Sequence, residues 1–151
     1  MGRPLSPLTA ARYMCERSDW TLTNLELQKM LYLAQMIYMG QHGGDRLLAG
    51  TFEAWDYGPV LPSVYREAKT YGSGPIRYIS AGARIDDPER QKMLDEAHDQ
   101  LSRASAGQLV SITHWKDGAW AKNYVPGARG VVIPDRDILE EYRRRAERNR
   151  D

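Results

Sequence analysis

The segment TNLELQKMLYLAQMIYM, residues 23–39, constrains the fold most, because it is a helix with apolar side chains on most of its sides. Thr23 and Glu26 have the spacing of a capping box, in which the threonine accepts from the N3 amide and the glutamate returns to the cap. Apolar residues then recur at steps of three and four. Others widen that stripe: Leu25, Leu33, Met36 and Met39. We therefore expect a central, mostly buried helix that ends at the glycines of residues 40–44.

Four further segments carry helix signals. Ser6 and Asp87 are each followed by proline, a good helix start because the side chain caps free N–H groups and proline lacks one. Ser105 and Gln108 repeat the capping-box spacing. Helical spacing of apolar residues also predicts helices over residues 61–71 and 135–150.

Two short segments favour β structure. TFEAW, residues 51–55, alternates apolar and polar side chains, and VVIP, residues 131–134, is a second candidate strand that we expect to pair with it. Gly58 and Pro59 predict a rigid corner between the first strand and the helix that follows. The predicted fold class is mainly α: a single compact helical domain over residues 1–142 with a small two-stranded β ribbon. Residues 143–151 are expected to form a charged C-terminal helix end or tail.

Net charge, cysteine count and the absence of long apolar runs exclude several classes of protein. The chain of 151 residues has 21 Lys plus Arg against 20 Asp plus Glu, and a net charge of +1 argues against a whole-domain grip on nucleic acid or membrane. Cys15 is the one cysteine, so an internal disulfide or a thiolate zinc cluster is excluded, and packing in an apolar helix face is favoured over reactivity. The first 20 residues lack the apolar run of a signal peptide, and no stretch approaches a membrane span. We expect a cytoplasmic protein with no membrane partner.

Catalytic motifs are scarce. The three histidines lack metal-binding spacing, and the chain has no GxSxG, P-loop or GxGxxG motif, so we expect no metal, no cofactor and no enzyme. The best remaining candidate lies in THWKDGAW, residues 113–120, where His114 and Asp117 have the types of an imidazole–carboxylate pair for a hydrolase. The alternative is a helix end at which Thr113 and His114 satisfy backbone groups while a tryptophan packs. The missing nucleophile favours that structural interpretation.

The C-terminal sequence RRRAERNR is the one basic cluster. Arg143, Arg144 and Arg145 suit phosphate, so a DNA-binding regulator of its own operon is an alternative function. The competing interpretation is a solvated last helical turn, where cations oppose the negative end of the helix dipole. That interpretation is favoured because acidic side chains dilute the patch: Glu140, Glu141, Glu147 and Asp151.

EAWDYGPVLPSVY, residues 53–65, gathers aromatic side chains around a turn. Trp55, Tyr57 and Tyr65 offer large contact areas with few rotors to immobilise, which makes such residues favoured anchors in interfaces. The alternative is that they fill the core while the turn only joins two elements. We expect both roles, with Trp55 inside, and with Tyr57 and the glycine–proline corner at or near a surface that binds protein.

Three stretches carry a family resemblance by their sequence and their order: TNLELQKMLYLAQ, then FEAWDYGPVLPSVYREAKTYG, then THWKDGAW followed by IPDRDILEEY. From about Ser6 to Tyr142 the chain resembles the Panacea domain family of SocA-type antitoxins. The resemblance implies a mainly helical, non-enzymatic antitoxin that neutralises a cognate toxin protein by direct protein–protein binding. It also implies a proteolytic adaptor, because SocA-type members hand their toxin to a Clp-type unfoldase–protease.

The family signature falls on Thr23, Asn24, Leu27, Gln28, Lys29, Tyr32, Ala34, Trp55, Tyr57, Gly58, Pro59, Val60, Val64, Tyr65, Thr113, His114 and Trp120. Ala119 stands where the family usually has a proline. From the resemblance and the aromatic turn together, we expect these residues to bind the partner protein: Tyr57, Gly58, Pro59, Val60, Tyr65, His114 and Trp120.

Overall fold

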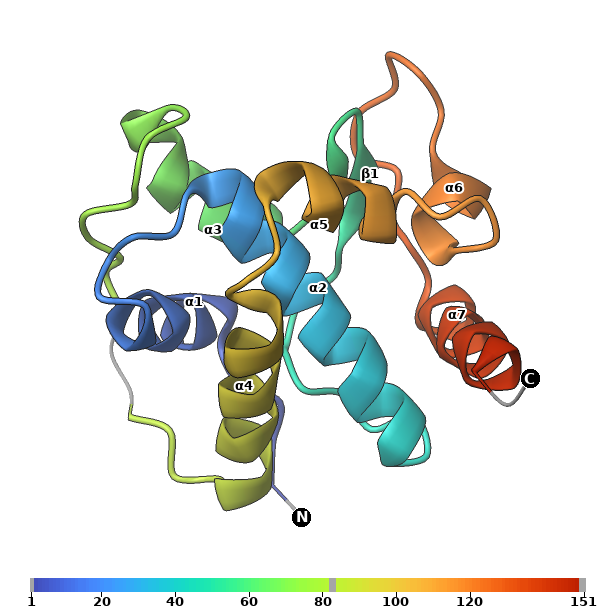
Figure 1. Ribbon diagram of the computed structural model, residues 1–151, viewed down its shortest axis with the longest axis horizontal. Coiled ribbons are helices and arrows are strands. Elements are labelled where there is room, and N and C mark those ends of the chain that lie inside the picture. The colour runs from blue at the N-terminus through green and yellow to red at the C-terminus, as the bar shows by residue number, and fades with distance from the viewer. Residues whose placement is uncertain (1, 82–83, 150–151) are drawn as a thin grey trace.

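The central element of the computed structural model, which describes residues 2–81 and 84–149, is helix α2, Asn24–Gln41 (Figure 1). It contacts α1, α3, α4, α5, α7 and β2, so its apolar side chains are covered on nearly every side. Its start is the predicted capping box: Glu26 N donates to Thr23 Oγ1 at 3.2 Å, and Thr23 N donates to Glu26 Oε1 at 3.0 Å. The prediction of a central buried helix is confirmed.

The other helices pack around α2, with α4 and α7 on two different sides of it (Figure 1). Their bounds are α1 Pro7–Arg17, α3 Pro62–Ala68, α4 Pro88–Leu101, α5 Ala106–Thr113, α6 Ala119–Asn123 and α7 Asp135–Arg148, with a 3₁₀ turn η1 at Lys69–Tyr71. The predicted mainly α fold with a small two-stranded ribbon is confirmed. The expected division at residue 142 falls within α7, residues 150–151 lie outside the described residues, and the division stays a prediction.

Helix starts follow the predicted chemistry with one exception. Asp87 accepts from the N–H of Arg90, and Ser105 and Gln108 form the second capping box. Ser6 stands at the N-cap of α1, but its side chain makes no capping hydrogen bond. Proline at the first position already removes one free N–H there, so the helix starts without that bond.

The predicted end of α2 was wrong at Gly40. The helix runs through Gly40 to Gln41, and a β-carbon at Gly40 would lie 2.1 Å from the Tyr142 ring. This glycine therefore allows α7 to approach α2 closely and does not end the helix. The chain turns at Gly43 instead, where φ is +63°, and Gly44 N donates to Met39 O.

The ribbon consists of β1, Glu53–Trp55, and β2, Gly58–Val60, paired antiparallel as a hairpin. The expected pairing of residues 131–134 with the first strand is confirmed by an antiparallel bridge between Glu53 and Val132. The second strand of the ribbon is β2, which was not predicted, because Gly58, with φ at +117°, lets the chain reverse at once. Residues 131–133 instead line the other edge of β1, where Ala54 N donates to Val131 O at 2.9 Å.

Two expectations about the aromatic turn also need correction. Trp55, expected inside, is half-buried, because β1 points it toward Tyr65 at the rim of the core. Gly58 and Pro59, expected at a surface corner, are buried within β2, which packs against α2 and α5.

Within the described ranges, no helix is both long and apolar enough to cross a membrane.

Candidate protein-binding site

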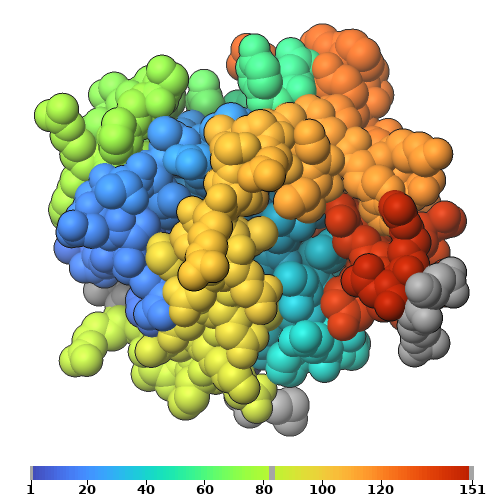
Figure 2. Space-filling view, in the orientation of Figure 1, coloured from blue at the N-terminus to red at the C-terminus, as the bar shows by residue number. Residues whose placement is uncertain are grey.

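The fold brings the hairpin together with the segment that follows α5, and the two lie side by side along one edge of the molecule (Figures 1 and 2). Trp120 Nε1 donates to the Trp55 carbonyl at 2.7 Å, which joins α6 to the hairpin. The Trp120 ring stacks on His114 with centroids 3.8 Å apart and on Tyr124 at 4.5 Å. We call this group the aromatic rim, and it consists of Trp55, Tyr57, Tyr65, His114, Trp120 and Tyr124.

Exposed apolar side chains gather beside the rim. Tyr57, at the hairpin turn, is 74% exposed, Val125 directly follows Tyr124, and Val132 lies opposite Glu53. These are three of the four large hydrophobic residues that are exposed in the described part of the chain, and the fourth is Tyr78. Exposed apolar patches commonly mark protein-binding sites, and this edge holds most of the exposed large hydrophobic residues described.

The predicted binding residues divide by accessibility. Tyr57 is exposed, and Tyr65 and His114 are half-buried, so these side chains reach the surface. The remaining predicted positions are buried and support the rim from beneath: Gly58, Pro59, Val60 and Trp120. Trp55 packs edge-on against Tyr65 with ring centroids 4.7 Å apart, which extends the rim toward α3.

His114 lies at a helix end, as the structural interpretation of its sequence expected. It is the C-cap of α5, and Thr113 Oγ1 donates to the Leu109 carbonyl at 3.0 Å. The structure describes both His114 and Asp117, and no hydrogen bond or ion pair joins them. Burial, with a smaller effect of Lys29, lowers the His114 pKa, although a backbone contact with Tyr57 opposes this. The imidazole is therefore neutral at pH 7.

Beneath the hairpin lies Lys29, a lysine that the described residues bury completely. Among the described residues, neither its Nζ atom nor His114 Nε2 has a hydrogen-bond partner. Desolvation lowers the Lys29 pKa from 10.5 to about 8. Sequence reasoning named Lys29 only as a family signature position. The signal that it missed is a single lysine inside a helix that is otherwise covered by apolar contacts.

On the other side of the rim, Glu141 is a buried carboxylate with a full set of partners. Its Oε1 accepts from Tyr32 Oη at 2.6 Å and from Ala119 N at 2.9 Å, and its Oε2 accepts from Arg145 Nε at 2.8 Å. Burial and the adjacent carboxylate raise the Tyr32 pKa well above its usual value. The expectation that Glu141 dilutes a surface charge patch was wrong, because this network fixes the start of α6 and so positions Trp120.

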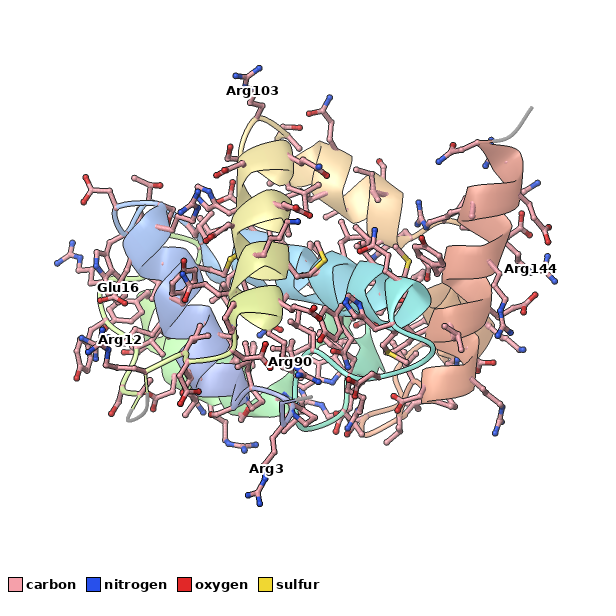
Figure 3. All side chains as sticks on the ribbon, turned by 90° about the horizontal axis from the view of Figure 1, so that it is seen from below. Arg3, Arg12, Glu16, Arg90, Arg103 and Arg144 are labelled. Atoms are coloured by element: carbon pink, nitrogen blue, oxygen red, sulfur yellow. The ribbon has the colours of Figure 1, made fainter. Side chains whose placement is uncertain are left out.

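The arginines at the end of α7 are already engaged with neighbours. Arg143 Nη1 lies 4.0 Å from Glu140 Oε2, and Arg144 Nε lies 3.3 Å from Glu140 Oε1. Arg144 projects away from the helix (Figure 3). Arg145 donates to the Ile112 carbonyl at 2.6 Å and lies against the Trp115 ring. These side chains are divided between acidic, backbone and aromatic partners, so they do not form one free basic patch.

Other chemistry finds no constellation in the described ranges. No group of three or more His, Cys, Asp or Glu side chains is placed to hold a metal ion there. Cys15 is buried, and desolvation raises its thiol pKa to about 12, which keeps it protonated. Two shallow surface hollows of about 340 Å³ lie along α4, away from the rim.

Comparison with known proteins agrees with the resemblance drawn from the sequence. The family model described as "Antitoxin SocA-like, Panacea domain" matches residues 27–121. The chain is 34% identical to "Antitoxin SocA" from Caulobacter vibrioides (strain NA1000 / CB15N) over 142 residues, which cover 83% of this chain and 74% of that protein. No solved structure matches the chain. With the family model covering more than half of its length, this chain belongs to the Panacea domain family of SocA-like antitoxins.

Proposed function

We propose that this protein is an antitoxin that neutralises a cognate toxin by holding it against the aromatic rim. The observation that carries the proposal is the gathering of Tyr57, Val125 and Val132 beside the hairpin of a chain that belongs to an antitoxin family. Inhibition by occlusion needs a rigid platform and anchor side chains, and no nucleophile or cofactor. The non-enzymatic role implied by the family is part of the same proposal.

An interface of ordinary size would occupy a small part of the surface of this chain. A stable interface buries about 800 Å² on each partner. That area is roughly a tenth of the 8420 Å² accessible surface of the chain. Energetic anchors concentrate at the centre of such a patch and are typically Trp, Tyr or Arg. Tyr57 is the anchor that we propose, because it is 74% exposed at the hairpin turn and the adjacent Asp56 is held by Tyr124.

We further propose that the protein acts as a proteolytic adaptor and delivers the bound toxin to a Clp-type unfoldase–protease. An adaptor needs a second contact that is separate from the toxin-binding surface. The exposed residues before α1 and the exposed arginines of α7 are candidates, because chain ends usually remain accessible. Measuring the half-life of the toxin in cells with and without the Clp protease tests this step. An equal half-life in both would rule out delivery while leaving inhibition by binding intact.

Direct binding is tested by co-expression with the product of the neighbouring gene. We expect the two proteins to copurify and the wild-type chain to relieve growth arrest. Tyr57→Ala should weaken binding by about thirtyfold or more, the loss typical of a central aromatic anchor. It should leave the free energy of unfolding within about 0.5 kcal/mol, because the side chain is exposed.

The matched control is Tyr78→Ala. Tyr78 is also exposed, but it lies in the connector between η1 and α4, away from the rim. This variant should bind and protect like the wild type. Equal losses in both variants, or none in either, would contradict the rim as the binding surface.

A further inference from the structure

We infer that Lys29 and His114 form a concealed receptor for a carboxylate group that the partner toxin inserts beneath the hairpin turn. The inference rests on the proposed function and adds to it the chemistry of the group that the toxin contributes. Three observations lead to it: the charge balance of the buried interior, the geometry around Gly58, and the position of the pair under the rim.

The first observation is that Lys29 is the exception among buried charged side chains. The described residues bury four of them: Lys29, Arg90, Asp137 and Glu141. The Arg90 guanidinium, which lies inside the fold near the start of α4, pairs with two aspartates and the Arg46 carbonyl (Figure 3). Asp137 accepts from Lys122 and Asn123, and Glu141 has three donors. A buried charge without a partner is costly, so an unpaired lysine calls for a reason.

The second observation is the geometry around Gly58. A β-carbon at Gly58 would lie 2.6 Å from Lys29 Nζ and 3.2 Å from His114 Nε2, so the two nitrogens face the same point of the hairpin backbone. Neither nitrogen has a hydrogen-bond partner. One comes from α2 and the other from the end of α5, and β2 covers both. Two unpaired nitrogens at one point define a site for an acceptor.

The chemistry of the acceptor follows from the groups that face the pair. Burial alone lowers the Lys29 pKa, so no carboxylate among the described residues compensates the charge of its amine. His114 faces the Lys29 amine and the Tyr57 backbone. The Lys29 ammonium only donates, and the neutral His114 ring donates from Nε2 in the tautomer that carries its proton there, so a carboxylate, which only accepts when ionised, matches both nitrogens. A carboxylate arriving here would favour the charged form of both groups.

The third observation is the position of the pair at the centre of the rim. The backbone of Gly58 separates the amine from the turn formed by Asp56 and Tyr57, and Tyr57 is the most exposed large hydrophobic residue described. A partner seated on the rim would exclude water around this point, which strengthens an ion pair formed beneath it. The inference requires the exposed turn at Asp56 and Tyr57 to shift so that the group can enter. An acidic side chain of the toxin is therefore the occupant that we propose.

Affinity for the toxin is the direct test. Lys29→Met keeps the volume of the side chain and removes its charge, so the variant should fold while binding toxin about thirtyfold more weakly or worse. The matched control is Lys122→Met. Lys122 is an exposed lysine at the end of α6, and its loss should change affinity less than threefold. Unchanged affinity in Lys29→Met would overturn the inference.

Formate supplies a second test that needs no toxin and no variant. In protein carrying ¹⁵N-labelled lysine, the Lys29 ammonium should titrate at higher pH in sodium formate than in sodium chloride at equal ionic strength. A titration that does not differ between the two salts would contradict a carboxylate receptor. If the wild-type chain fails to bind the toxin at all, the proposed function fails, and the formate titration still decides whether the receptor exists.

Discussion

Two buried charges, Lys29 of α2 and Glu141 of α7, have opposite surroundings. The Glu141 carboxylate accepts hydrogen bonds from the Tyr32 hydroxyl of α2, from Ala119 N and from the Arg145 guanidinium. Lys29 lies three residues before Tyr32 on α2, and its amine has no hydrogen-bond partner among the described residues. The first arrangement compensates the cost of burial within the fold, and the second leaves it uncompensated.

The difference indicates that the Glu141 network has a structural role and that the Lys29 site has the binding role that we infer. The Glu141 network ties α2, α6 and α7 together and sets the position of Trp120, so the fold needs it complete. The Lys29 site lowers the stability of the free protein and gains its counterion only from outside. Removing a charge should therefore have opposite effects at the two sites, and the variants below are ordered from the largest expected effect to the smallest.

Breaking the complete network should cost most. Glu141→Ala leaves the Arg145 guanidinium and the Tyr32 hydroxyl without their carboxylate, so we expect a loss of about 3–5 kcal/mol in the free energy of unfolding. Urea denaturation followed by circular dichroism measures it. Glu140→Ala, which removes the adjacent and more exposed carboxylate, should cost less than about 1 kcal/mol. Similar losses in the two variants would contradict a special role for the network.

Raising the pH should relieve the uncompensated charge. Folding lowers the Lys29 pKa from 10.5 to about 8, so between these values the unfolded chain binds more protons than the folded one. Stability due to this group therefore rises with pH, by about 3 kcal/mol across the interval. Lys29→Met should lack that rise, while titration of other groups cancels in the comparison. A stability difference between wild type and variant that stays constant from pH 7 to 10 would mean that Lys29 is not desolvated.

A methyl group added at Gly58 tests how closely the hairpin backbone packs on the Lys29 amine. Gly58→Ala places a side chain at φ +117° and against Lys29 Nζ, so we expect a loss of about 2 kcal/mol in stability. Gly72→Ala is the matched control, because Gly72 also has a positive φ, +59°, but an added β-carbon meets nothing within 4 Å. It should cost about 1 kcal/mol. An equal loss in both variants would show that backbone strain alone matters at Gly58.

The smallest effect is expected at the surface arginines. Replacing Arg143 and Arg144 together by alanine removes two weak contacts with Glu140 and should change stability by less than about 0.5 kcal/mol. Calorimetric titration should give unchanged affinity for the toxin. Retardation of promoter DNA by the wild type, lost in this double variant, would instead support a DNA-binding regulator.

Local sequence rules predicted the helical frame well. Capping boxes at Thr23 and Ser105 and the cap at Asp87 depend on residues within one turn of each other, so spacing alone identifies them. The ribbon was predicted less well. The pairing of residues 131–133 with β1 was predicted from their β-prone pattern, but the hairpin partner β2 was not, because it depends on the turn geometry of Gly58.

The buried polar groups were the hardest to predict. Glu141 reads as one of several acids on a charged helix, and only the packing of α7 against α2 turns it inward toward Tyr32. Lys29 stands in a helix whose apolar pattern the sequence does reveal. Its missing counterion, however, is a property of three elements together: α2, β2 and the end of α5. Sequence spacing carries no information about such a convergence.

Hydrogen–deuterium exchange of this chain with and without its toxin tests most directly where the protein binds. We expect slower amide exchange in the complex over residues 53–65 and 113–125, with no change over residues 72–80. Slower exchange along α1 and α4, with the hairpin and the end of α5 unaffected, would contradict it.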